Sequence, residues 1–306
     1  MRYSPLLAAD PSDQRFASPL ERFTSGGWTQ GVLRLALGLG VLAIVVHFAA
    51  RDAVTLLLDR GVTAALLLGV PVHLLQRALR IEKWRRMIEH SGLVTRRFTF
   101  LMRVQLIGMM ANLLLPVSEA LKIWAVSRDR RDLVPAGASL VLDGMLHAAM
   151  VGGLGLIGAM AAASSSVTLW TAAAAMALAP LTLIAALQWR GRRRRTIHVL
   201  DARVLLWCAL ETVCQVSLYA IAFRAIGVGA GVSQLLALAP LLFLADLVMV
   251  TPSGLGLREA LFAVVLQTLS GAPADASVAV ALLVTAILLV ASAIGGVLAL
   301  LVPAES

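Results

Sequence analysis

Apolar runs long enough to cross a bilayer recur along the chain, and they constrain its fold more than any other feature. A transmembrane helix needs about 20 mostly apolar residues. Six such runs lie at about 31–50, 61–80, 136–160, 168–189, 203–226 and 276–302. The chain is only 14% charged, whereas soluble domains carry about 25% charged residues. We therefore predict an all-α polytopic membrane protein with six full spans, a polar cytoplasmic tail at 1–30 and a single membrane domain at 31–306.

Two further apolar segments are interrupted by residues that break helices. One begins at Phe98 and meets Pro116, and the other begins at Gln234 and meets Pro252. After each break, the chain resumes as an arm too short to cross alone. Irregular backbone is tolerated at membrane depth only where protein or a water-filled cavity covers it. Each segment is therefore expected to form a re-entrant helical hairpin.

The basic residues predict how these segments are oriented. Of 26 Lys and Arg residues, eight lie within 77–103, four within 122–131 and six within 190–203. Basic loops stay in the cytoplasm, so both termini are expected there, in the inner membrane of a bacterial-type cell. The net charge of +9 is then explained by anionic lipid and not by nucleic acid. Residues 31–160 and 168–302 become repeats of opposite orientation, an inverted-topology repeat of the kind found in secondary transporters.

The second break carries the clearest candidate binding site. Pro252 ends the incoming helix, and Gly254 and Gly256 expose backbone N–H groups. The next helix would begin at about Leu257, so its free N–H groups would point into the break. Together with Arg258, these groups would form an anion site suited to a phosphate. The structural alternative is a simple kink in which Arg258 pairs with Glu259 or Asp246.

The first break offers a second group of candidate binding residues. Asn112 precedes Pro116, and Glu119 and Lys122 follow it, three residues apart on one helical face where they can pair. Glu119 would take up a proton or neutralise a cationic headgroup. The alternative is that Glu119 only complements the dipole of its own helix.

Polar residues also lie inside the predicted spans, where they should face the protein interior. Glu211, Gln215 and Tyr219 form a stripe along one helix. Asp143 and His147 share a face of another, and His147 is expected to make a helix-packing hydrogen bond. Glu211, and Asp246 before the second break, would serve either the substrate or the packing of helices.

The end of the second span is rich in arginine and lysine. Arg77, Arg80 and Trp84 share a face that could hold a lipid phosphate. Anchoring at the cytoplasmic surface is the favoured explanation for most of these charges, including that of Lys83.

The glycines of one predicted span and the two cysteines are expected to have structural roles only. Four glycines are expected to allow close helix packing: Gly152, Gly153, Gly155 and Gly158. Cys208 and Cys214 are six residues apart and would point to different faces, which predicts neither a disulfide nor a metal site. The chain lacks a Walker motif and the HExxH metalloprotease motif, so an ATP-driven pump and a metalloprotease are disfavoured and no cofactor is expected.

The two broken segments resemble those of the lysylphosphatidylglycerol synthase transmembrane-region family, also called flippase-like integral membrane proteins. That family has a late P-G-G-x-G-x-x-E element, similar to Pro252–Glu259 here. Its early N-x-x-x-P and G-E-x-x-R elements are similar to Asn112, Pro116, Glu119 and Lys122. Arg80 and Trp84 resemble its Arg-x-x-x-Trp-like end of the second span.

The resemblance implies a lipid transporter without catalytic activity. It would move a phospholipid or a polyprenyl-linked lipid between leaflets, since aminoacyl transfer in the family belongs to a separate soluble domain. One alternative is a non-catalytic scaffold for a lipid-modifying enzyme or glycosyltransferase. Another is an integral membrane lipid transferase that uses Asp143 and His147.

Overall fold

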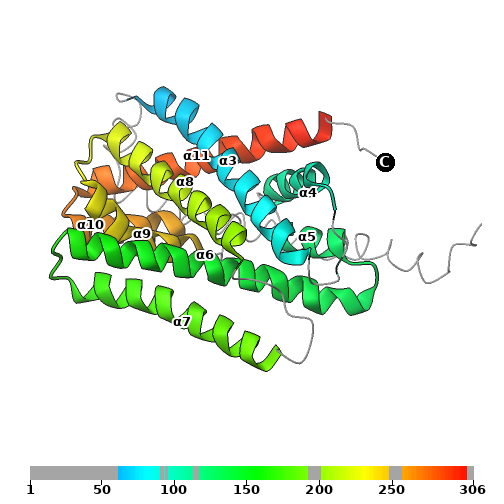
Figure 1. Cartoon of the computed structure of the whole chain (residues 1–306). Helices are drawn as coiled ribbons and strands as arrows, with labels where there is room; N and C mark the ends of the chain where they lie inside the picture. Colours follow the sequence, from blue (N-terminus) through cyan, green and yellow to red (C-terminus); the bar gives the residue numbers. More distant parts are fainter. Residues whose placement is uncertain are drawn as a thin grey trace, which may run out of the picture.

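The computed structural model is an assembly of helices that describes residues 61–89, 93, 96–112, 117–191, 201–247 and 257–301 (Figure 1). Five of its helices are long and apolar enough to cross a membrane: Val62–Ile88, Arg130–Ala161, Val167–Ala185, Ala202–Ile226 and Ala274–Ala299. They confirm the apolar helices predicted from residue 61 onward, and these described ranges contain no strand. The predicted tail at 1–30 and the first predicted span at 31–50 lie outside the described residues.

The described elements follow one another in a fixed order. They are α3 (Val62–Ile88), α4 (Phe98–Ala111), α5 (Ser118–Val126), the short 3-10 helix η2 (Arg130–Asp132), α6 (Leu133–Ala161), α7 (Val167–Gly191), α8 (Ala202–Ile226), α9 (Val232–Leu247), α10 (Leu257–Ser270) and α11 (Ala274–Leu301).

Each interrupted segment forms a pair of short helices in contact with each other. The first pair is α4 and α5, and the second is α9 and α10. In Figure 1 the two pairs lie at opposite ends of the bundle, with α4 and α5 at the right and α9 and α10 at the left. Two pairs of short helices therefore stand where the sequence predicts interrupted segments, whereas their re-entrant course stays a prediction.

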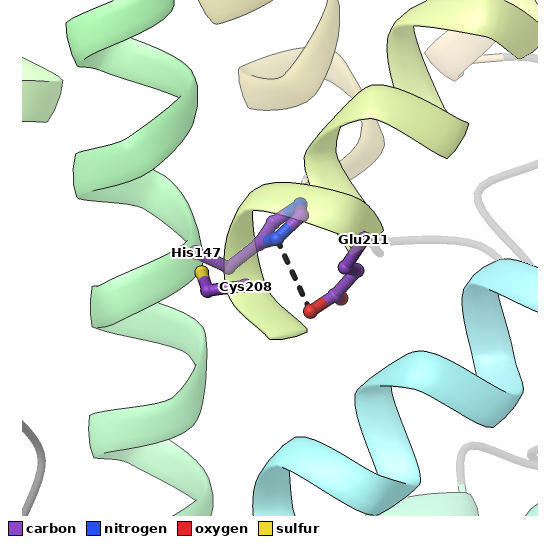
Figure 2. A group of neighbouring side chains, drawn as sticks. All are labelled: His147, Cys208 and Glu211. Atoms are coloured by element: carbon purple, nitrogen blue, oxygen red, sulfur yellow. Dashed lines mark ion pairs between the residues drawn. The ribbon is translucent and has the colours of Figure 1, made fainter. Parts of the chain in front are cut away.

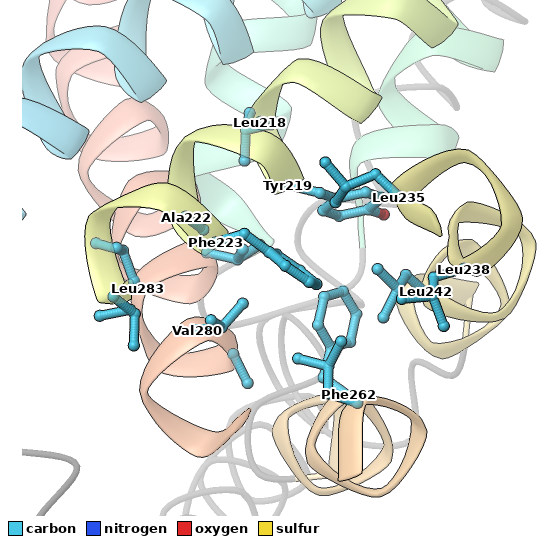
Figure 3. Packing of buried hydrophobic residues seen from close by; sticks show 14 of the residues in the cluster. Leu218, Tyr219, Ala222, Phe223, Leu235, Leu238, Leu242, Phe262, Val280 and Leu283 are labelled. Carbon is cyan, nitrogen blue, oxygen red and sulfur yellow. The ribbon is translucent and has the colours of Figure 1, made fainter. Parts of the chain in front are cut away.

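The long helices pack around a shared core. Helix α3 lies along α8, α6 packs against both α7 and α9, and α11 contacts α3, α4 and α10. Figure 3 shows side chains of α8, α9, α10 and α11 meeting in the largest buried cluster. There the rings of Tyr219 and Phe262 meet edge to face with their centroids 5.7 Å apart, a favoured arrangement of aromatic rings.

Local sequence explains where α8 begins and ends. The Asp201 carboxylate accepts a hydrogen bond from the backbone N–H of Arg203 at the first turn, a typical N-cap. Gly227 follows the last turn with a φ of 80°, a left-handed conformation that glycine adopts without steric cost.

Glycines on α6 allow two neighbouring helices to approach its backbone. A Cβ on Gly152 would lie 2.4 Å from the backbone N of Ala177 in α7. A Cβ on Gly158 would lie 2.4 Å from the backbone N of Ala237 in α9. Gly155 lies equally close to α9, and the predicted close packing is thus confirmed for three of the four glycines. It is wrong for Gly153, whose missing Cβ would meet nothing within 4 Å, because that position is on a different face of the helix.

Glycines on α11 play the same part toward α4. A Cβ on Gly295 would lie 2.7 Å from the Leu106 side chain, and one on Gly296 would lie 2.5 Å from the Met110 sulfur. Each of these two long helices therefore presents glycines to the first arm of an interrupted segment: α6 to α9, and α11 to α4.

We predict that Gly158→Ala lowers the stability of the protein and that Gly153→Ala does not. The new methyl group at 158 would push α9 away from α6, and overpacking of this kind costs about 1–3 kcal/mol. The apparent Tm of the two purified variants in the same detergent provides the measurement. Equal Tm values would show that the approach of α6 to α9 is not a stabilising contact.

Candidate functional site

A polar cavity of about 160 Å³ lies between the helices. Its polar lining comes from α3, α6, α8 and α10: His73, Gln76, Arg77, Arg80, His147, Glu211, Gln215, Tyr219 and Arg258. Its apolar lining includes Leu218, Phe243, Val284 and Leu288. The cavity thus combines guanidinium groups with a hydrocarbon wall, a suitable environment for a charged group attached to an apolar chain.

Helix α3 contributes a polar face to this cavity. His73, Gln76, Arg77 and Arg80 follow one another at helical spacing, and all four line the cavity. Residues three and four apart on a helix share a face, so local sequence is enough to align them. Their common direction is decided by α8, against which α3 packs.

Beside the cavity, Lys83 holds two carboxylates from other helices. Its side chain is 0% exposed, with Nζ 2.9 Å from Asp143 Oδ1 in α6 and 2.6 Å from Glu211 Oε2 in α8. Arg80 joins the same network, since its Nε donates to Asp143 Oδ2 at 3.0 Å. Two cations and two anions therefore bind α3 to α6 and α8.

The surface anchoring predicted for the end of α3 is wrong for Lys83. Lys83 and the neighbouring Trp84 are both buried in the bundle. The indole Nε1 of Trp84 donates to Ser139 Oγ of α6 at 2.9 Å. The helix ends at Ile88. Lys83 meets the carboxylates of α6 and α8, whereas the nearby Arg86 stays 33% exposed.

A second row of hydrogen bonds crosses from α3 to α6. Gln215 of α8 is at its centre, and its Oε1 lies 3.3 Å from Gln76 Nε2 and 2.6 Å from His147 Nε2. Its Nε2 donates to the Tyr219 hydroxyl at 2.9 Å. The predicted stripe of Glu211, Gln215 and Tyr219 is confirmed as a buried face, and His147 makes an interhelical hydrogen bond, as predicted.

Arg258 reaches the cavity from the first turn of α10. Its Nη2 lies 3.1 Å from Glu259 Oε1 and donates to Thr285 Oγ1 of α11 at 2.6 Å. The Thr285 hydroxyl in turn donates to Glu259 Oε1. The ion pair with Glu259 is the one that the structural alternative expected. Arg258 also lines the cavity, and its role in binding an anion stays a prediction.

The candidates at the first break lie outside this cavity lining. Asn112 Oδ1 accepts a hydrogen bond from the backbone N–H of Ser118 at 2.9 Å, so it bridges the break to the first turn of α5. Lys122 is buried, and its Nζ lies 2.6 Å from Glu119 Oε2. The predicted pairing of Glu119 with Lys122 is confirmed, whereas their binding role stays a prediction.

Three predicted site residues receive no structural test. Gly254 and Gly256 lie outside the described residues, as does the side chain of Asp246. The proposed N–H cradle of the second break therefore stays a prediction, and the description of Arg258 rests on α10 and α11 alone.

One group of side chains has the residue types of a metal site. Figure 2 shows His147 of α6 facing Cys208 and Glu211 of α8, with ligand atoms within 4.8 Å of one another. The Lys83 ammonium already occupies this neighbourhood, with Nζ 2.6 Å from Glu211 Oε2 and 3.9 Å from Cys208 Sγ. A metal cation would have to displace that ammonium, so we assign no metal to this group. Both cysteines are free thiols.

Four contributors to the site were missed from the sequence. His73, Gln76 and Lys83 could have been found, because polar residues at helical spacing within an apolar run indicate a face turned toward the protein interior. Thr285 had no such signal. A threonine in a long apolar helix is unremarkable, and its contact with Glu259 depends on how α10 packs against α11.

Comparison with known families agrees with the resemblance inferred from the two broken segments. The family model described as "Lysylphosphatidylglycerol synthase TM region" matches residues 31–296 of the chain. No curated protein and no solved structure matches the chain.

We predict that Lys83→Met strongly destabilises the protein. Removing one partner of a buried ionic group leaves the others uncompensated, at a cost of about 3–5 kcal/mol. Arg86→Met is the matched control on the same helix, because Arg86 is 33% exposed and pairs with Glu82 near the surface, where ion pairs contribute about 0–1 kcal/mol. Thermal unfolding in detergent distinguishes the two. A Lys83→Met protein as stable as the control would contradict the central role of Lys83.

Proposed function

The chain belongs to the lysylphosphatidylglycerol synthase transmembrane-region family, and we propose that it moves a phosphate-bearing lipid between the two leaflets of a membrane. The substrate would be a phospholipid or a polyprenyl-linked lipid. The headgroup would enter the polar cavity while the hydrocarbon chain stays in the bilayer. No covalent step is required of the protein.

The observation that carries this proposal is the convergence of three guanidinium groups on one cavity. Arg77 and Arg80 come from α3, and Arg258 comes from α10. Arg80 uses its Nε toward Asp143, and 25% of its side chain stays accessible. Guanidinium groups bind phosphate through pairs of N–H donors in a fixed plane, and such a donor pair on Arg80 can face a phosphate in the cavity.

The size and lining of the cavity favour a headgroup over a whole lipid. A volume of about 160 Å³ has room for several water molecules. That space suits a phosphodiester but not two acyl chains. The apolar lining at Leu218, Phe243, Val284 and Leu288 would lie against the first carbons of the lipid tail.

The arrangement of the short helices supports alternating access. We propose that the α4–α5 and α9–α10 pairs are re-entrant hairpins that enter from opposite faces, since they lie at opposite ends of the bundle (Figure 1). The glycine contacts of α6 with α9 and of α11 with α4 are those expected of two inverted repeats packed through equivalent surfaces. Rocking of one repeat against the other would expose the cavity to each side in turn.

The basic residues favour one orientation for this transporter. The end of α3, the η2 turn and the beginning of α8 carry arginines, whereas the α6–α7 and α8–α9 connections carry no charge. By the positive-inside rule, the arginine-rich ends would face the cytoplasm of a cell with an inner membrane. The C-terminus would then be cytoplasmic, as would the N-terminus.

We predict that Arg80→Gln and Arg258→Gln slow the movement of labelled phosphatidylglycerol in proteoliposomes about 10- to 100-fold. Each change removes charge-assisted hydrogen bonds to phosphate, which contribute about 1.5–3 kcal/mol. Arg224→Gln is the matched control, because Arg224 is exposed near the end of α8 and does not line the cavity. The measurement is the rate at which the label becomes accessible to a membrane-impermeant quencher.

Two outcomes would favour the other candidate functions. Variants of Arg80 and Arg258 that move lipid at the wild-type rate, together with an enzyme that copurifies with the chain, would favour a scaffold. Loss of lipid modification without loss of movement would favour a transferase. Asp143 pairs with Lys83 and His147 with Gln215, contacts that support the transport proposal over a transferase.

A further inference from the structure

Side chains beside the cavity form a continuous row of hydrogen bonds, and Arg77 at one end determines which group donates and which accepts along it. Arg77 Nε donates to His73 Nε2 at 3.2 Å. A guanidinium has donors and no acceptor, so His73 Nε2 must accept. Neutral His73 therefore carries its proton on Nδ1, which donates to Gln76 Oε1 at 3.1 Å.

The donor and acceptor roles fixed in α3 also determine those of Gln215 in α8. Gln76 Oε1 accepts from His73, so Gln76 Nε2 is the group that donates to Gln215 Oε1, at 3.3 Å. Gln215 is thereby oriented with its oxygen toward α3 and α6 and its amide nitrogen toward the Tyr219 hydroxyl. An amide oxygen can only accept.

The acceptor role of Gln215 Oε1 determines which nitrogen of the His147 imidazole carries the hydrogen. Its Nε2 lies 2.6 Å from Gln215 Oε1, so Nε2 must carry a hydrogen and donate. A neutral imidazole has one N–H group, and His147 Nδ1 would then be bare. Yet Nδ1 is buried, has no hydrogen-bond partner among the described residues, and lies 3.4 Å from the carboxylate oxygen Oε2 of Glu211.

We propose that His147 Nδ1 is a proton-binding site, stabilised by Glu211, that couples lipid movement to a proton. A bare nitrogen lone pair facing a carboxylate inside a protein is unfavourable, and one added proton turns that contact into an ion pair. The proton would come from water in the cavity, which His147 lines. The inference rests on the proposed function for its transport step, but the protonation site itself does not.

Other groups near His147 bear on the site. The titratable or charged side chains around it come from α3, α6, α8 and α10: His73, Arg77, Arg80, Lys83, Asp143, Cys208, Glu211, Tyr219 and Arg258. Helix α9 places the apolar ring of Phe243 against it, with centroids 5.1 Å apart. The described side chains of α7 include no titratable group. Glu211 is therefore the carboxylate that faces His147 Nδ1.

The position of the site sets the direction of coupling. A proton on His147 adds positive charge to the cavity that Arg80 and Arg258 also line. A phosphate is then held more strongly when His147 is protonated. Lipid and proton would accordingly travel in the same direction.

Nitrogen NMR of the full chain with ¹⁵N-labelled histidine tests the proton site directly. The His147 signals are identified by their absence from a His147→Asn variant. At high pH we expect hydrogen on Nε2 and none on Nδ1, and on acidification Nδ1 should take up the proton. Hydrogen on Nδ1 with a bare Nε2 at high pH would overturn the proposal, and this measurement needs no variant other than the one used for identification.

Removal of the facing carboxylate gives a second measurement. Glu211→Gln should weaken proton binding by His147 about 10-fold or more, since an opposite charge at this distance favours the charged form to that extent. Glu89→Gln is the matched control, because that carboxylate is 25% exposed beyond the end of α3 and is absent from the cavity lining. Equal proton affinity of His147 in the two variants would refute the role of Glu211.

Coupling is tested in vesicles of phosphatidylethanolamine and phosphatidylglycerol that contain labelled phosphatidylglycerol. Acidifying the donor side by about one pH unit should raise the rate of the wild type up to about 10-fold, whereas the rate of His147→Gln should no longer respond to the gradient. A wild-type rate that ignores the gradient would refute coupling. A wild type that moves no lipid at any pH would refute the proposed function, and the NMR result would still decide the protonation site.

Discussion

The burial of a single ammonium group organises the interior of this protein. Lys83 has no exposed side-chain surface and lies between carboxylates of two other helices. Without it Asp143 would keep only Arg80 and Glu211 would lose its ammonium partner, and an uncompensated buried charge costs several kcal/mol. The polar face of α3 is thus held against α6 and α8 in one register. That register aligns Arg77, Arg80 and His147 around the same cavity.

The two lysines of the chain, Lys83 and Lys122, are both buried and ion-paired, whereas the other basic residues are arginines. An ammonium is a compact charge with three donors that can satisfy carboxylates converging from different helices. A guanidinium is planar and keeps donors available beyond its first partner, as at Arg80. Both lysines therefore neutralise buried or half-buried carboxylates, whereas Arg80 pairs with Asp143 and also lines the cavity.

Helix packing follows the constraints of a lipid solvent. Hydrocarbon chains are as apolar as leucine, so close backbone approach and interhelical polar contacts hold transmembrane helices together. Glycines of α6 and α11 provide the close approach, while Lys83 and Gln215 provide the polar contacts. The polar cavity lies among these helices.

The sequence by itself determined the membrane class, the apolar helices from residue 61 onward and the existence of two broken segments, because hydropathy, charge and helix breakers are properties of short windows. It also indicated the buried stripe of Glu211, Gln215 and Tyr219 and the cavity position of Arg258. Only the tertiary structure decided that Lys83 leaves the membrane surface for the interior, since its partner Glu211 is 128 residues away in the chain. The tertiary structure also decided which groups donate and which accept in the row of hydrogen bonds from Arg77 to His147. A side chain's donor role depends on its neighbours in space and not on its neighbours in sequence.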